Sequence, residues 1–212
     1  MNEPKKKDRN AWLRTLLQWH WISSAICLIG LLGFSITGFT LNHAGEIEAK
    51  PAVHNQTGTL TPDLLKLLDD SPAANKDKAN APLPPAVRDK LMAESSLRWP
   101  AETEAEWSPD EVYLPLPRPG GDAWLRIDRH EGSYEAEVTD RGWLAYFNDL
   151  HKGRHTGTAW RWFIDLLAIG CCLFALTGLL ILQIHARHRA LTWPLVGAGL
   201  LLPALVALLL MH

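Results

Sequence analysis

Three long stretches without any charged residue constrain this chain more than any other feature. They cover residues 15–45, 166–186 and 190–212. Each holds about 20 apolar or small residues, enough to cross a hydrocarbon core of roughly 30 Å as a helix. The segment between the first two stretches is polar and rich in Pro, Asp, Glu and Lys. The pattern predicts a small membrane protein with three spanning helices and one soluble insert.

The first apolar stretch has a secretory signal peptide as its alternative interpretation. Its apolar run is longer than the apolar region of a signal peptide, and no clear Ala-x-Ala cleavage site closes it. It also contains Thr37, Gly38 and Thr40, small residues that are usual inside a packed spanning helix. We therefore interpret this stretch as a spanning helix.

The three cysteines limit the chemistry of the insert. Cys27, Cys171 and Cys172 all fall inside predicted spans, and the insert has none. A disulfide framework and a thiol-based site in the insert are therefore both excluded. Adjacent cysteines in an apolar helix are interpreted as packing residues, because buried Cys behaves as a small apolar side chain.

Basic residues near the apolar stretches set the expected orientation. Residues 1–14 and the short loop at 185–190 are basic, and basic segments next to spanning helices stay in the cytoplasm. The expected location is the inner membrane of a bacterium, with the insert in the periplasm. The expected order is a cytoplasmic basic tail (1–14), a spanning helix (15–43), the periplasmic insert (44–155), a second spanning helix (156–184), a cytoplasmic loop (185–190) and a third spanning helix (191–211).

The insert has the pattern of a small α+β module. "LTPDLLKLLDD" reads as a short helix with Thr61 as N-cap and Pro62 in the first turn, and "AVRDKLMAES" as a second. The Pro-rich "KANAPLPPA" between them is expected to be a connector. Three later segments alternate apolar and polar residues around Pro-Gly-Gly and His-Glu-Gly turns, which predicts β-hairpins: "DEVYLPLP", "DAWLRIDRH" and "GSYEAEVTD".

Histidines gather at the ends of the predicted spanning helices. In the expected topology one group is cytoplasmic (His20, His185 and His188) and the other is periplasmic (His43, His151 and His155). A single histidine is weak evidence for a ligand, since loop and interface histidines are common. Two groups at opposite leaflets, each drawing on two helices, are stronger evidence, because ionisable groups at membrane depth tend to be paired and functional.

These groups suit haem better than zinc. Imidazole is a common axial ligand of haem iron, whereas structural zinc sites use four ligands and usually include Cys or a carboxylate. Each group also has cations nearby that would neutralise haem propionates and would repel a metal dication. They are Lys152, Arg154 and Arg161 on the periplasmic side and Arg14, Arg187 and Arg189 on the cytoplasmic side.

Two segments carry a resemblance to a known family. They are "WHWISSAICLIGLLGFSITGFTLNHA" and "NDLHKGRHTGTAWRWFIDLLAIGCCLFALTGLLIL". With the insert between them, the chain resembles the PepSY-associated transmembrane proteins, in particular their short three-span members. The resemblance implies that the insert is a PepSY-like module. It also implies kinship to larger inner-membrane reductases of ferric siderophores, which hold haem between histidines at the two leaflets.

The resemblance also implies the cofactor, one or two haem b groups, and the residues that hold it. It favours His20 and His43 on the first helix and His151 on the second, with His155, His185 or His188 completing the set. The expected cofactor-binding residues are therefore His20, His43, His151, His155, His185, His188, Arg154 and Arg161. The expected axial ligands of the haem iron are His20, His43, His151 and His185.

The segment "NDLHKGRHTG" separates the insert from the second spanning helix. His151 and His155 are four residues apart there, a spacing that would place them on one face of a helix. Gly153 and Gly157 disfavour a continuous helix, and Thr156 is a suitable N-cap for the spanning helix. We therefore expect His151 to lie on the approach to the helix, as the partner of His43.

The predicted function is haem-mediated electron transfer that reduces a ferric siderophore or other periplasmic iron complex, as a possible ferrisiderophore reductase. Reduced iron binds hard oxygen donors less well and is released. No G-x-G-x-x-G follows a predicted strand, so the electron donor is expected to be a quinol or a partner protein. Three helices are few to enclose two haems, which favours a homodimer, and no nucleic-acid partner is expected.

Two other functions remain open from the residues. One is a PepSY-type membrane-anchored binding or regulatory module without redox chemistry, since the insert contains no catalytic motif. The other is an accessory protein whose histidines pass copper or iron during uptake or assembly.

Overall fold

The computed structural model describes residues 4–47, 50–74, 79–186 and 189–210. The chain forms two compact units, residues 1–34 with 162–212, and residues 35–161. The elements are α1 (Pro4–Asn42), β1 (Ala52–Thr59), α2 (Pro62–Asp69), β2 (Ala79–Pro82), α3 (Pro85–Glu94), β3 (Glu104–Trp107), β4 (Glu111–Pro115), β5 (Gly121–Asp128), β6 (Ser133–Asp140), α4 (Gly142–Lys152), α5 (Gly157–His185) and α6 (Thr192–Leu210).

Three helices are long and apolar enough to cross a membrane: Asn10–Asn42 of α1, Gly157–His185 and Thr192–Leu210. Almost none of their apolar side chains is buried inside the chain, which is the surface that a lipid bilayer covers. The helix α1 begins at Pro4, eleven residues before the expected start at 15. The apolar stretch limits only the part of the helix that can cross a membrane, and the helix itself extends beyond it into the basic N-terminal segment. Proline is also well tolerated in a first helical turn.

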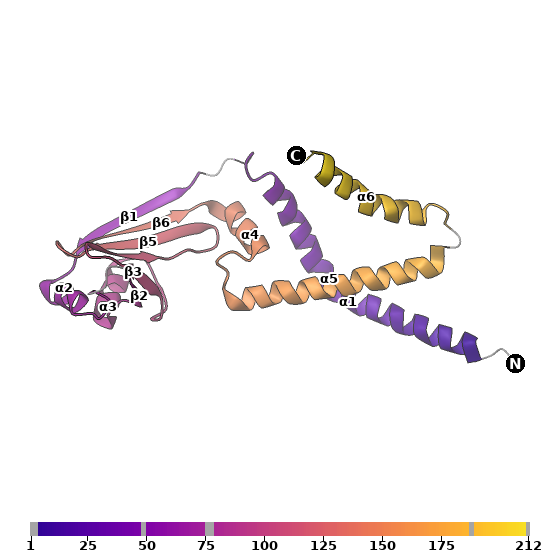
Figure 1. The fold of residues 1–212 in the computed structure, drawn as a ribbon, viewed down its shortest axis with the longest axis horizontal. Coiled ribbons are helices and arrows are strands. Elements are labelled where there is room, and N and C mark those ends of the chain that lie inside the picture. The colour runs from indigo at the N-terminus through magenta and orange to yellow at the C-terminus, as the bar shows by residue number, and fades with distance from the viewer. Residues whose placement is uncertain (1–3, 48–49, 75–78, 187–188, 211–212) are drawn as a thin grey trace. The chain divides into compact units, whose positions relative to one another are not determined.

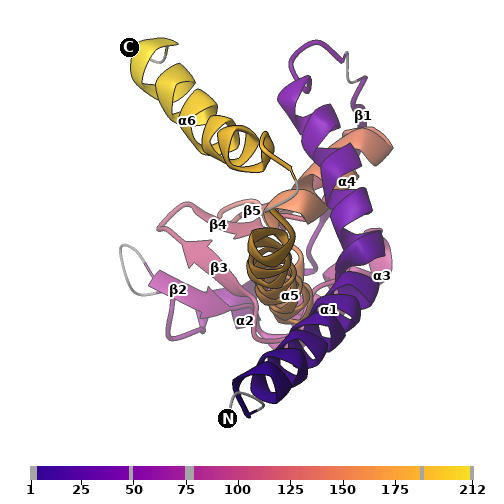
Figure 2. The ribbon, with the colours of Figure 1, turned by 90° about the vertical axis from the view of Figure 1, so that its right-hand side faces the viewer.

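Small residues let α1 and α5 pack closely where they cross (Figures 1 and 2). Cys27 is buried, and its thiol lies 3.9 Å from the main-chain oxygen of Leu167. A Cβ on Gly170 would lie only 2.5 Å from the Cys27 sulfur. On the same stretch of α1, a Cβ on Gly30 would clash with the Leu167 side chain. This close approach is typical of spanning helices, and the buried Cys27 is a packing residue within it.

The insert (residues 52–140) is a six-stranded antiparallel sheet with strand order β1-β6-β5-β4-β3-β2. The helices α2 and α3 lie against one face (Figure 1) and form a single hydrophobic core with it. Alternate side chains of β4 and β5 point into this core and the others do not. This alternation confirms the expected hairpins and the α+β character of the insert.

The sheet is larger than the sequence indicated. The strands β1 and β3 were not predicted, and β2 occupies the segment expected to be a connector. The strand β2 forms one edge of the sheet and ends at Pro82, and an edge strand tolerates a proline that cannot donate to the ladder. The helix α4 was also unexpected, because the approach to the second spanning helix was not predicted to be helical.

His130, in the turn between β5 and β6, pairs with Asp110, in the turn between β3 and β4, and this pair predicts a measurable pKa. The His130 Nε2 atom lies 3.1 Å from Asp110 Oδ1, and this hydrogen bond raises the pKa of His130 above its ordinary value. The pair therefore stabilises the fold fully below the ordinary histidine pKa, and this contribution is lost as the pH rises through the raised value. In an NMR titration, Asp110→Asn should return the His130 pKa toward its ordinary value; an unchanged pKa would contradict the assignment.

Candidate functional site

The first candidate site surrounds His20, which is half-buried between α1 and α5. Its Nδ1 atom lies 3.0 Å from the hydroxyl oxygen of Thr177. That hydroxyl donates its own hydrogen to the main-chain oxygen of Leu173 at 2.7 Å, so its oxygen is left to accept. This arrangement favours the tautomer in which Nδ1 of His20 carries the hydrogen of this bond and Nε2 of the neutral ring holds the lone pair.

Two neighbours on α5 shape the space around the His20 ring. The ring stacks on Phe174, with centroids 4.8 Å apart and planes 16° apart. A Cβ on Gly178 would lie 3.2 Å from His20 Cε1, so the missing side chain leaves room for the imidazole. The site is thus built by Phe174, Thr177 and Gly178, all within two turns of one helix.

The second candidate site repeats this arrangement around His151 at the end of α4. The His151 Nδ1 atom lies 2.7 Å from the hydroxyl oxygen of Thr37 on α1. A Cβ on the next residue, Gly38, would lie 3.5 Å from His151 Cε1. In both sites a histidine from one helix therefore rests on a consecutive Thr-Gly pair of another helix.

The helix α4 owes its position to polar contacts of three neighbouring side chains. Besides the bond from His151 to Thr37, Asn148 accepts a hydrogen bond at 3.0 Å from the hydroxyl of Thr40 on α1. The buried Asp149 accepts one at 2.9 Å from the main-chain N–H of Gly120, in the turn before β5. One face of α4 is therefore fixed to both the sheet and the end of α1.

The helix α4 and the spanning helix α5 are separate. The helix α4 ends at Lys152, and Gly153 adopts the left-handed conformation with φ of 65°, a common helix C-terminus. His151 is thus still helical, whereas the sequence placed it on a non-helical approach. Thr156 immediately precedes α5 as expected, but its buried hydroxyl has no hydrogen-bond partner within the described residues.

His43 and His185 have their Nδ1 atoms bonded to carbonyl oxygens of their own helix turns. His43 donates to Phe39 O at 3.0 Å, and His185 donates to Ile181 O at 2.9 Å. A carbonyl oxygen can only accept, so Nδ1 must carry the hydrogen in both rings. Their neutral imidazoles, like that of His20, then hold the lone pair on Nε2.

The remaining histidines lie elsewhere. His155 is exposed and is the one non-glycine residue with positive φ in the described part of the chain, at 56°. His54 is exposed on β1, and His130 belongs to the turn pair already described. His188 and His212 lie outside the described residues.

The two arginines among the expected cofactor-binding residues, Arg154 and Arg161, are both exposed. Arg154 lies 4.0 Å from the carboxylate of Asp149, and Arg161 donates to the hydroxyl of Thr158 at 3.4 Å. Within the residues that the structure covers, no three His, Cys, Asp or Glu side chains converge as a site for a bare metal ion.

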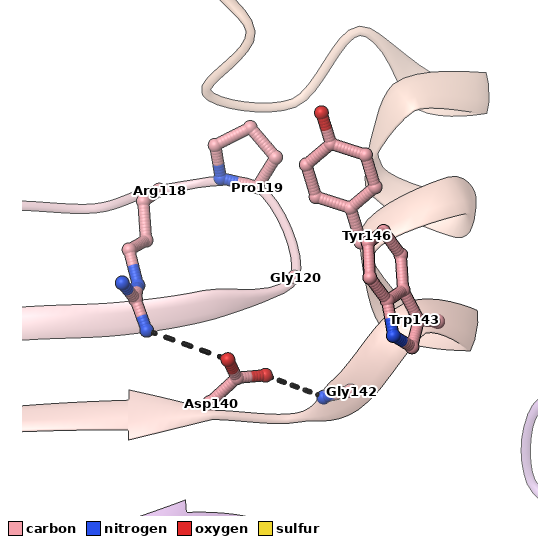
Figure 3. A pocket seen from close by; sticks show the side chains of 7 residues that line it. All are labelled: Arg118, Pro119, Gly120, Asp140, Gly142, Trp143 and Tyr146. Atoms are coloured by element: carbon pink, nitrogen blue, oxygen red, sulfur yellow. Dashed lines mark hydrogen bonds and ion pairs between the residues drawn. The ribbon is translucent and has the colours of Figure 1, made fainter. Parts of the chain in front are cut away.

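A cavity of about 570 Å³ lies between the turn before β5 and α4 (Figure 3). Arg118 and Asp140 form an ion pair of 3.8 Å on its floor, and Asp140 also accepts from Gly142 N at 2.7 Å. Trp143 and Tyr146 of α4 form the opposite wall (Figure 3). The cavity is open, and both members of its ion pair are largely exposed.

The sequence revealed the histidines of the sites but not their partners. Thr37 was interpreted as a small residue of a packed spanning helix and Thr177 was not singled out, because threonine in an apolar helix usually bonds its own turn. The available signal was a Thr-Gly pair inside each of the first two apolar stretches, at 37–38 and at 177–178. Asn148 and Asp149 were not predicted as site residues. An amphipathic helix usually buries its aromatic residues and exposes its polar ones, and α4 does the reverse.

The sequence model of the family described as PepSY_TM-like matches residues 11–212, which include all three apolar helices and the insert. The chain belongs to this family. No curated protein and no solved structure matches it. The PepSY_TM-like protein thus combines three helices able to cross a membrane with a sheet domain inserted between the first two.

Proposed function

We propose that this PepSY_TM-like protein is an electron-transfer protein of the bacterial inner membrane. It holds haem b through histidines at both leaflets and reduces a ferric siderophore or other ferric complex in the periplasm. Its cytoplasmic ligands are His20 and His185, and its periplasmic ligands are His43 and His151.

One observation carries this proposal: each of the four proposed ligands has its Nδ1 atom engaged in a hydrogen bond. Iron-binding histidines commonly donate their second ring N–H in this way, which fixes the tautomer and ring orientation and raises the basicity of the ligating nitrogen. In each proposed pair, one histidine is bonded to a threonine and the other to a carbonyl oxygen of its own helix. His20 is paired in this way with His185, and His151 with His43.

The chain's residues fit haem at His20 in particular. The structure gives His20 Nε2 no hydrogen-bond partner among the described residues, while Thr177 secures Nδ1 and Gly178 leaves space beside Cε1. When bound, haem supplies an iron that takes up and passes on one electron at a time. The protein's own part is to orient the imidazoles and to hold them in an apolar, water-poor environment.

The overall reaction needs a reductant, for which we propose a membrane quinol. Oxidation of one quinol to the quinone releases two electrons and two protons, and each ferric complex takes one electron. One quinol therefore reduces two Fe(III) complexes to Fe(II), which hard oxygen donors bind less tightly.

The test is to purify the full chain in detergent after expression with ample haem. We expect a red protein with a sharp Soret band that shifts on reduction with dithionite. His20→Ala and His151→Ala should each remove haem absorbance, because each deletes an axial ligand. His54→Ala is the matched control, since His54 is exposed on β1 and should leave the spectrum unchanged.

Three outcomes contradict parts of the proposal. A colourless wild-type chain would overturn haem binding and favour a PepSY-type binding or regulatory module. Full haem content in both alanine variants would overturn the ligand assignment. A haem-loaded protein in quinol-containing vesicles that gives no ferrous iron from external ferric complexes would overturn the reductase function.

A further inference from the structure

We propose that Thr177 and Thr37 are positioning residues that lock His20 and His151 as Nδ1–H tautomers and thereby present Nε2 to iron. The inference rests on the proposed function for its ligand, but the tautomers themselves are a property of the chain alone. It assigns a role to two threonines that the apolar character of their helices had hidden.

The geometry at Thr177 favours one direction of the hydrogen bond. A threonine hydroxyl has one hydrogen and can accept two hydrogen bonds. The Thr177 hydroxyl lies 2.7 Å from Leu173 O and 3.1 Å from Phe174 O, and both oxygens can only accept. A hydroxyl hydrogen directed to Leu173 O, the shorter of these contacts, leaves the oxygen of Thr177 to accept from His20 Nδ1.

The environment makes this bond strong and specific. Thr177 is the one buried residue of α5, and no water reaches the interior of a bilayer to replace a lost partner. The His20 ring is further held by stacking on Phe174 and by the gap at Gly178. A rotated ring would leave the Thr177 oxygen without its donor, so the observed orientation is the stable one.

The recurrence at Thr37 supports a positioning role over an accident of packing. The bond from His151 to Thr37 joins the same atom types as the bond from His20 to Thr177, at 2.7 Å and 3.0 Å. A glycine follows the threonine in both, and its missing Cβ faces the same ring atom, Cε1. The two histidines lie on different helices, and so do the two threonines.

The first experiment measures the tautomers in the full chain purified without haem. Nitrogen-15 NMR of labelled histidine distinguishes a protonated from a bare ring nitrogen, and His20→Gln and His151→Gln assign the two signals. We expect both rings to carry hydrogen on Nδ1. Thr177→Val and Thr37→Val should each shift their own histidine toward the other tautomer, whereas Thr177→Ser and Thr37→Ser should retain the Nδ1–H form.

The second experiment measures haem binding and the midpoint potential of the loaded full chain. Loss of such a hydrogen bond lowers metal affinity about 10- to 100-fold, so each valine variant should lose haem by this factor. The potential should rise, because a less basic imidazole stabilises Fe(III) less. A tenfold loss of affinity that affects only the Fe(III) state raises the midpoint potential by about 59 mV. The serine variants should restore both the haem affinity and the midpoint potential.

Thr15→Val is the matched control, because Thr15 lies on α1 and its hydroxyl bonds Ala11 O. It should change neither tautomer nor potential. Valine and threonine have the same shape, so a purely structural role for Thr177 and Thr37 would be kept in the valine variants. Wild-type tautomers and a wild-type midpoint potential in these variants would therefore overturn the inference. A wild-type chain that binds no haem but shows the expected tautomer changes would instead contradict the proposed function alone.

Discussion

Replacing Trp107 by alanine is expected to lower the free energy of unfolding of the insert by about 3–5 kcal/mol. Trp107 is only 2% exposed, in the core between the sheet and its two helices. Its indole N–H also donates to Ala81 O in β2 at 2.9 Å. The substitution therefore leaves a large cavity and removes a side-chain bond that reinforces the main-chain pairing of β2 with β3.

Pulse proteolysis of the full chain in increasing urea measures this effect, because cleavage of the insert reports its unfolding while detergent protects the spanning helices. Trp143→Ala is the matched control, since Trp143 is 78% exposed on α4. Its urea midpoint should stay close to that of the wild type. Similar losses in the two variants would show that the core does not lie where the structure has it.

Replacing Gly120 by valine is expected to detach α4 from the sheet, at a cost of about 2–6 kcal/mol from backbone strain and overpacking together. Gly120 has φ of +73°, and a Cβ there would lie 2.7 Å from Tyr146 Cβ and 2.8 Å from Tyr146 Cα. The wall of the cavity (Figure 3) leaves no space for that atom. The bond from Gly120 N to Asp149 at 2.9 Å would be lost as well.

Because Asp149 and His151 lie two residues apart on α4, the same variant should also lose the haem absorbance that we propose to depend on His151. Gly142→Ala is the control: its φ is +82°, but nothing lies within 4 Å of its added Cβ. It carries the backbone strain without the clash and should keep its haem. Haem loss of equal size in both variants would contradict the proposed coupling between the turn and His151.

The predictable part of the fold was the part in which one physical requirement dominates the sequence. Lipid excludes charge, so the charge-free stretches at 166–186 and 190–212 overlap α5 and α6. The strands β4, β5 and β6 bury one face and alternate accordingly. In β1 the side chains from Ala52 to Thr57 are all exposed, so its pairing with β6 depends on main-chain hydrogen bonds, which leave no pattern in the sequence.

The candidate site was predictable to a similar degree. Histidine is rare enough in a spanning segment to be noticed, so His20, His43 and His151 stood out. Their hydrogen-bond partners did not, because Thr177 in an apolar helix resembles any other small packing residue. The buried Asp149 was equally hidden, since its partner is a main-chain N–H in a turn 29 residues earlier in the chain, a contact that only the folded insert creates.

The two ends of the insert meet, since Ala52 at the start of β1 is paired with Asp140 at the end of β6. Directly opposed residues of antiparallel strands have Cα atoms about 4.5–5.5 Å apart, so the chain enters and leaves the sheet at nearly one point. Domains with adjacent ends tolerate transfer between host chains, and a two-residue turn is long enough to close such a gap. Residues 52–140 therefore form a module that joins the rest of the chain at nearly one point and is held to α4 by the bond from Gly120 N to Asp149.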